Sequence, residues 1–194
     1  TGSALDHRIC QFADAGDLQG LVETDPEHGR ARLARVGAAL DFGGIGKGYA
    51  LDRAAVVLED RGVRRALLDF GGQFLALDPP PGEAGWKVEL RDARDPRKIR
   101  STVRLVRASI ATTADYERGL AIDGKRHSHV VDPRTGRPVE GMLGASVVCA
   151  TATEADALST ALYVLGPGTG AELARRRNAA ALLVPTMGPE FTDE

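Results

Sequence analysis

Apolar positions recur at helical spacing in two parts of the chain. In the first part, which follows Gly48, apolar and charged residues divide onto opposite faces until Gly62 ends the pattern. In the second part, a helix over 154–165 is interrupted by Gly and Pro at 166–168 and resumes over 170–177. The pattern therefore predicts one amphipathic helix early in the chain and a broken helix near its end.

Shorter apolar runs, separated by turn residues, predict strands between and around these helices. In chain order the runs are 18–22, 31–36, 65–70, 74–77, 86–90, 102–106, 109–113, 120–122, 127–131, 142–150 and 180–184. The first two predict a hairpin, Asp123-Gly124 predicts another between 120–122 and 127–131, and 86–90 with 102–106 are expected to continue the sheet. Because hairpins mix with helices, we predict an α+β domain with a mixed, mainly antiparallel sheet and packed helices.

Composition narrows the class of protein. The 194 residues carry a net charge of -2, with 43% hydrophobic and 5% aromatic residues, so one globular domain is expected and a nucleic-acid partner is not. No apolar run approaches the roughly 18 residues of a membrane span. Cys149, in an apolar run, is expected in the core, and two cysteines leave the cellular compartment open.

The glycine-rich segment 43–48 precedes the first predicted helix. It is not a P-loop, because Lys47 is followed by Gly48 rather than Ser or Thr, and the dinucleotide fingerprint fails at Tyr49. Two readings remain from the residues alone. The segment is a tight strand-to-helix turn, or its backbone N–H groups bind a phosphate with help from Lys47.

Asp156 and Thr160 lie four residues apart in the second helical part. At this spacing a carboxylate and a hydroxyl share one helix face and form a compact oxygen site suited to Mg²⁺. The same spacing is common on solvated helix surfaces. The pair is therefore a metal-site hypothesis that depends on the rest of the chain.

Two more segments carry candidate chemistry. Thr112, Thr113 and Asp115 lie where a predicted strand meets a loop, which suits phosphate contact or proton transfer as well as a capped turn. His129 and His127 leave a strand on one face near Asp132, but two imidazoles are too few for a strong zinc claim. A single histidine acting as a general base is the more plausible role.

Five segments, taken in order over roughly residues 39–185, resemble the motifs of the ApbE family of FAD:protein FMN transferases. The segments are Asp41-Phe-Gly-Gly-Ile-Gly-Lys-Gly-Tyr-Ala-Leu-Asp52, Leu67-Leu-Asp-Phe-Gly-Gly72, Ser109-Ile-Ala-Thr-Thr-Ala-Asp-Tyr-Glu117, His129-Val-Val-Asp-Pro-Arg-Thr-Gly136 and Glu154-Ala-Asp-Ala-Leu-Ser-Thr160. The resemblance implies a T-fold-like ApbE domain over 39–194, preceded by an extension or hairpin at 1–38. It also implies an enzyme that takes FAD and Mg²⁺, moves FMN onto a Thr or Ser hydroxyl of an acceptor protein, and releases AMP.

The resemblance also assigns roles by position. Asp156, Thr160 and the backbone carbonyl of Gly46 would match the metal ligands, and His129 the proposed base, with Asp115 as a second catalytic candidate. The expected FAD-binding residues are Gly44, Gly46, Lys47, Gly48, Asp52, Thr112 and Thr113.

The chain departs from the family pattern in three respects. Ala114 stands where the family has Gly, so its methyl group is expected to narrow the diphosphate site, and Gln73 stands where an acid or Asn is usual. Family members also have an N-terminal part that shapes the flavin pocket, and the resemblance implies that this chain lacks it. Two alternatives therefore stay open: a FAD diphosphatase that yields FMN and AMP, and a non-catalytic flavin-binding domain. Relatives are often exported or lipid-anchored, and no anchoring segment is seen in this sequence.

Overall fold

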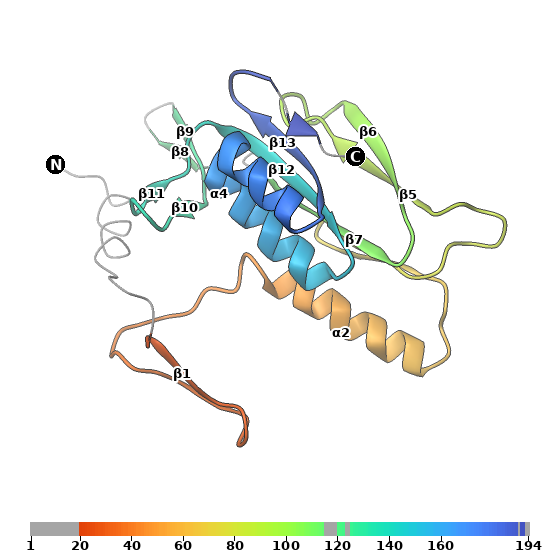
Figure 1. Cartoon of the computed structure of the whole chain (residues 1–194), viewed down its shortest axis with the longest axis horizontal. Helices are drawn as coiled ribbons and strands as arrows, with labels where there is room; N and C mark the ends of the chain where they lie inside the picture. The colour runs from red at the N-terminus through yellow and green to blue at the C-terminus, as the bar shows by residue number, and fades with distance from the viewer. Residues whose placement is uncertain (1–19, 115–119, 123–124, 190, 193–194) are drawn as a thin grey trace.

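A six-stranded antiparallel sheet forms the centre of the molecule (Figure 1). The computed structural model describes residues 20–114, 120–122, 125–189 and 191–192. Across the sheet the strands are β14 (Phe191–Thr192), β13 (Ala180–Pro185), β12 (Met142–Cys149), β7 (Ala108–Ala114), β4 (Gln73–Ala76) and β3 (Leu67–Phe70). Neighbouring strands of this sheet pair antiparallel throughout, which agrees with the mainly antiparallel sheet that the sequence predicted.

Two helices, α2 (Gly46–Asp60) and α4 (Ala152–Arg176), pack on one face of this sheet. Helix α4 contacts β7, β12 and β13, whereas α2 contacts β3, β4 and the first helix turns of α4 (Figure 1). The predicted break in α4 is confirmed, because Gly166 has φ 74° and ψ -178° and interrupts the helical backbone there. Thr151 caps the start of α4, since its hydroxyl accepts a hydrogen bond from the backbone N–H of Glu154.

The opposite face of the sheet is partly covered by a ribbon of two strands, β5 (Trp86–Arg91) and β6 (Ile99–Leu105). The prediction that these strands continue the central sheet is wrong, because within the described part of the chain they pair only with each other. Their buried side chains, Val88 and Leu105, pack against Ile110 of the sheet instead. The apolar runs predicted the two strands themselves, but side-chain alternation does not determine which backbone edge a strand joins.

Successive side chains of β7 point to opposite faces of the sheet. Ala111 packs among the residues of α4, and Thr113 also points toward that helix. Ile110 and Thr112 point to the other face, where the β5–β6 ribbon lies. The sheet is therefore the middle of three layers, which explains why β12 reads as a nearly continuous apolar run.

Besides the β5–β6 ribbon, three small hairpins of the described residues lie outside the central sheet. They are β1 (Val22–Asp25) with β2 (Arg30–Leu33), β8 (Leu120–Ile122) with β9 (Lys125–His127), and β10 (Val131–Asp132) with β11 (Arg137–Pro138). The first two confirm predicted hairpins, although β1 starts and β9 ends several residues from the expected bounds. Cys149 is buried in the core, as expected. Neither helix of the described residues is long and apolar enough to cross a membrane. The predicted α+β class is confirmed.

Candidate functional site

A cleft of about 450 Å³ opens where the start of α2 meets α4 and the end of β7. Five stretches of chain that are distant in sequence contribute to its walls. Seven of the residues predicted from the sequence line it: Gly44, Lys47, Thr112, Thr113, His129, Asp156 and Thr160. Gly46, Gly48 and Asp52 lie beside the cleft rather than on its wall, and Asp115 lies outside the described residues.

The glycine-rich segment forms a turn that leads directly into α2. Asp41 accepts a hydrogen bond from the N–H of Gly43 at 2.6 Å, and the N–H of Gly46 donates to the Phe42 carbonyl at 2.7 Å. A Cβ built at Gly44 would lie 3.3 Å from the hydroxyl oxygen of Thr160. The turn thus brings its backbone against α4, and a side chain at Gly44 would fill that part of the cleft.

Asp156 sits at the N-terminus of α2 although it belongs to α4. Asp156 is only 2% exposed. One oxygen of its carboxylate, Oδ2, accepts a hydrogen bond from the N–H of Gly48 at 3.0 Å. The other oxygen, Oδ1, accepts from Nζ of Lys47 at 3.1 Å. Helix α2 has no acidic residue in its own first turn, so Asp156 supplies the negative charge that the positive end of the helix dipole favours.

Asp52 does the same for the other helix. From α2 its carboxylate accepts the N–H groups of Ala152 and Thr153, at 2.8 and 2.9 Å, and the hydroxyl of Thr153 at 2.6 Å. These contacts support a positioning role for Asp52 at the start of α4. Its predicted contact with FAD stays a prediction.

The two helices cross at Gly48 and Ala152. A Cβ built at Gly48 would lie 2.2 Å from the Ala152 carbonyl oxygen, so only glycine fits at this crossing. The same carbonyl accepts a hydrogen bond from Nε2 of Gln73 at 2.8 Å. Gln73 is buried, and its Oε1 atom has no partner within the described residues. The residue that departs from the family pattern therefore supports the crossing from the sheet side.

Hydroxyl groups line the β7 side of the cleft. Thr113 Oγ1 is 2.9 Å from Ser159 Oγ and 3.3 Å from Thr160 Oγ1, whereas Thr112 Oγ1 is 2.8 Å from Ser146 Oγ on the other face of the sheet. The antiparallel register, which pairs Ser146 with Thr112, produces the second contact. Ser159 and Ser146 were not predicted from the sequence. The sequence could have predicted Ser159, because residues three apart share a helix face and Ser159 lies three residues after Asp156.

His129, between β9 and β10, also lines the cleft and is exposed. Asp132, the nearby acid, is held in a turn instead of facing a metal site: it accepts from the Arg134 side chain, and this interaction lowers the pKa of its carboxyl group. No three His, Cys, Asp or Glu side chains of the described residues gather as a ligand set. The side chain of His127 lies outside what the structure describes.

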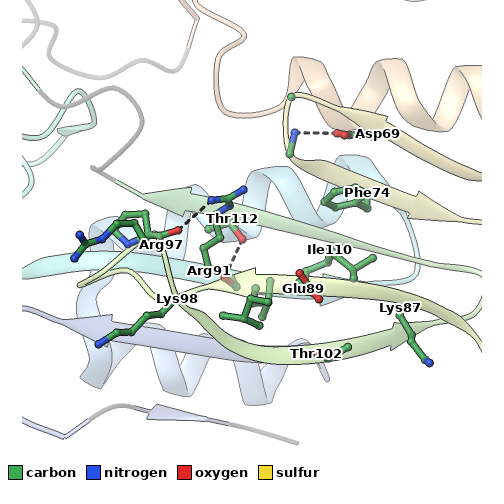
Figure 2. A pocket seen from close by; sticks show the side chains of 17 residues that line it. Asp69, Phe74, Lys87, Glu89, Arg91, Arg97, Lys98, Thr102, Ile110 and Thr112 are labelled. Atoms are coloured by element: carbon green, nitrogen blue, oxygen red, sulfur yellow. Dashed lines mark hydrogen bonds between the residues drawn. The ribbon is translucent and has the colours of Figure 1, made fainter.

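A second groove adjoins the cleft. Figure 2 shows this groove between the β5–β6 ribbon and the face of the sheet that the ribbon partly covers. Its volume is about 850 Å³. Phe74 and Ile110 form its apolar side, and charged residues such as Lys87 line the ribbon side. Gly71 and Thr112 border both hollows, so the groove and the cleft are neighbours.

Fold and cleft together define an α+β domain in which two mutually capped helices and an antiparallel sheet enclose a polar cleft. The chain matches the ApbE family over residues 8–183 and belongs to that family. The family resemblance of the five motifs is thereby confirmed.

Proteins of known name and structure agree with this assignment. The chain is 34% identical over 154 residues to the FAD:protein FMN transferase of Escherichia coli (strain K12), a match that covers 78% of this chain and 44% of the relative. With the Treponema pallidum (strain Nichols) protein of the same name it shares 34% over 167 residues, or 81% of this chain and 46% of the relative. The chain thus spans under half the length of these curated relatives.

Solved structures show the same fold. The ApbE protein of Thermotoga maritima MSB8 superposes with a TM-score of 0.84 at 30% identity, covering 97% of this chain and 61% of that one. The apo form of the Pseudomonas stutzeri flavinyl transferase ApbE gives 0.79 at 31% identity, covering 100% and 60%. The T-fold-like ApbE architecture expected from the motifs is confirmed by these likenesses.

Proposed function

We propose that this chain transfers the FMN moiety of FAD to a Thr or Ser hydroxyl of an acceptor protein, releases AMP, and requires Mg²⁺. One observation carries the proposal: residues from separate motifs converge on one cleft. The glycine turn, Lys47, Thr113, His129 and the pair Asp156–Thr160 all face the same space. The names of the relatives support the same reaction class.

The residues of the cleft fit a magnesium ion. Asp156 and Thr160 offer one carboxylate and one neutral oxygen, which with the Gly46 carbonyl, substrate oxygens and water would approach the about six ligands that Mg²⁺ prefers. Two structural observations support the fit. The ammonium of Lys47 already sits 3.1 Å from Asp156 Oδ1, so the carboxylate accommodates a cation, and the glycine at 44 leaves open the space beside Thr160.

Such an ion would neutralise the charge that develops on a diphosphate as it is cleaved. The chain's own residues would hold the substrate. The start of α2 directs its positive end toward the cleft, Lys47 adds a full charge, and the hydroxyl of Thr113 would donate a hydrogen bond to a phosphate oxygen. The hydroxyl of Thr112 lies on the other face of the sheet, so any contact of Thr112 with the substrate would come from that face.

His129 is the proposed base. It would take the proton of the acceptor hydroxyl while that oxygen attacks the phosphorus on the FMN side of the diphosphate. A new phosphoester bond forms between the acceptor oxygen and FMN, the bond between the two phosphates breaks, and AMP leaves with the electron pair. The exposed position of His129 on the cleft wall leaves room for an acceptor polypeptide to approach.

The test is to incubate the purified chain with FAD and either MgCl₂ or EDTA. Each reaction is run with a Thr-containing acceptor peptide, with the same peptide carrying Val at that position, and without peptide. AMP and flavin-labelled peptide are followed by chromatography and mass spectrometry. We expect AMP together with labelled peptide only when Mg²⁺ and Thr are both present.

Other outcomes assign other functions. AMP release that does not depend on the peptide would replace the transferase with a FAD diphosphatase. Tight flavin binding without AMP in any reaction would leave a flavin-binding domain.

A further inference from the structure

The ion pair between Lys47 and Asp156 lies in the wall of the cleft and joins the two helices. Lys47 comes from the first turn of α2, and Asp156 from the second turn of α4. The Asp156 side chain is 3% exposed and that of Lys47 is 29% exposed. The carboxylate is therefore fixed in position by its burial, while the ammonium is on the solvent side of the pair.

Both oxygens of Asp156 are in use. Oδ2 accepts a hydrogen bond from the N–H of Gly48, which joins the second turn of α4 to the start of α2. Oδ1 accepts a hydrogen bond from Lys47, and Asp156, Lys47 and Thr160 all line the cleft, so Oδ1 is the oxygen of Asp156 that a backbone N–H does not already occupy. A dication that binds Asp156 in this cleft therefore meets the oxygen that already holds an ammonium group.

Two cations on one carboxylate oxygen repel each other strongly in a partly buried site. Lys47 is the partner that can leave, since its long side chain is flexible and partly exposed, and the glycines at 44 and 71 leave room around it. A Cβ built at Gly71 would lie 3.9 Å from Cδ of Lys47, which places the lysine stem beside the Gly71–Gly72 turn.

We propose that Lys47 is a resident counter-ion of Asp156, that Mg²⁺ displaces it, and that the freed ammonium then binds the diphosphate of FAD. The proposal rests on the proposed function, because it assumes that metal and FAD share this cleft. Without FAD, Lys47 and Asp156 neutralise each other, and an added dication leaves the site with excess positive charge. FAD brings one negative charge on each of its two phosphates and restores neutrality. Lys47 therefore weakens metal binding to the free protein and couples it to FAD binding.

The first experiment measures Mg²⁺ affinity by titration calorimetry without FAD. The variants are Lys47→Met, which keeps the length of the side chain without its charge, and Lys47→Arg, which keeps the charge. Removing the competing ion pair should tighten Mg²⁺ binding about five- to tenfold in Lys47→Met and leave Lys47→Arg near the wild-type value. The affinity of the magnesium-loaded protein for FAD should fall in Lys47→Met, again by about fivefold or more.

The second experiment needs no variant and detects displacement directly. The wild-type protein is acetylated briefly with an amine-reactive ester, and mass spectrometry measures the labelling of each lysine. The exposed Lys87 and Lys98 serve as internal standards. Adding MgCl₂ should raise the labelling of Lys47 relative to these two lysines, and adding FAD as well should lower it again.

Each alternative result has a definite meaning. Tighter binding in Lys47→Met without a magnesium-dependent change in labelling would show repulsion without displacement and would overturn the proposal. Equal Mg²⁺ affinities of the wild type and Lys47→Met would also overturn it. If Asp156→Asn nevertheless loses Mg²⁺ binding, the proposed metal site at Asp156 still stands. Absence of Mg²⁺ binding in both the wild type and Lys47→Met would remove the inference and the magnesium requirement together.

Discussion

Asp52 and Asp156 cap each other's helices. Asp52, on α2, accepts two backbone N–H groups at the start of α4, and Asp156, on α4, accepts the N–H of Gly48 at the start of α2. Each carboxylate thereby satisfies donors that the opposite helix cannot satisfy within itself. The two acids look alike in sequence, yet only Asp156 also faces the cleft. Their substitutions should therefore separate structure from chemistry.

Asp52→Asn should lower the free energy of unfolding by about 1–3 kcal/mol, because it replaces an ionised acceptor of three hydrogen bonds with an amide. Urea denaturation measures this change. Activity of the folded fraction should fall by less than tenfold. A loss of turnover at unchanged stability would instead give Asp52 a direct role in binding FAD.

Asp156→Asn should affect turnover far more than stability. The amide oxygen can still accept the Gly48 N–H, so we expect a loss of about 1–2 kcal/mol in stability. Magnesium-dependent AMP release should drop by roughly 10²-fold or more, because the proposed metal loses its charged ligand. Arg175→Ala, at an exposed position of α4 that does not line the cleft, is the control for turnover and should leave turnover unchanged. Unfolding of Asp156→Asn under assay conditions would mark the residue as structural.

Gly48→Ala should be strongly destabilising, by about 3 kcal/mol or more, because its methyl group would overlap the Ala152 carbonyl and force the helices apart. Gly46→Ala, two residues earlier, is the matched control. Its Cβ would meet only Phe42 Cβ at 3.4 Å, an ordinary contact, so stability should change by less than about 1 kcal/mol. Thermal unfolding of both variants tests the helix crossing without any assumption about function.

His129→Gln should reduce transfer to the acceptor by roughly 10²–10⁴-fold while leaving FAD and Mg²⁺ binding within a factor of about three. The residue is exposed, so the midpoint of thermal unfolding should not move. Single-turnover transfer and calorimetric FAD binding measure the two effects separately. Loss of FAD affinity with an unchanged rate from the bound complex would make His129 a binding residue rather than a base.

The buried thiol of Cys149 should make the free energy of unfolding depend on pH in the alkaline range. Burial, with a smaller contribution from the Glu154 carboxylate, raises the pKa of its thiol from 9.0 to about 11. Between these values the unfolded chain loses the proton that the folded protein retains, so stability falls as pH rises, by about 2–3 kcal/mol in total. Urea denaturation of the wild type and Cys149→Ala from pH 7.5 to 10.5 isolates this contribution. Because pH 10.5 lies below the folded-state pKa, the stability difference between the two proteins should shift by about 2 kcal/mol over this range, and parallel pH profiles would contradict the assignment.

The sequence predicted local structure well where one segment determines it. The helix after the glycine turn, the break at Gly166 and the α+β class depend on local spacing, and all three are confirmed. The placement of the β5–β6 ribbon was wrong, because the same side-chain alternation fits a strand within the sheet and one lying over it.

The candidate site was predictable as a set of residues but not as an arrangement. The motifs, taken in order, predicted Asp156, Lys47 and Thr113 as members of one site, and the structure places all three around one cleft. The Lys47–Asp156 pair and the Gly48–Ala152 crossing join positions more than a hundred residues apart. No spacing rule reveals such contacts, since they depend on how the helices cross above the sheet.

The cleft is assembled from segments that run from Asp41 to Thr160, so its formation coincides with completion of the domain. Contacts of such long range are slow to form and are lost together when the sheet opens. A ligand that occupies the cleft should therefore protect the whole chain against unfolding, and it should do so in a single cooperative transition. The lifetime of the native state should therefore increase with the fraction of protein that has ligand bound. Resistance to proteolysis would then depend on the concentration of substrate.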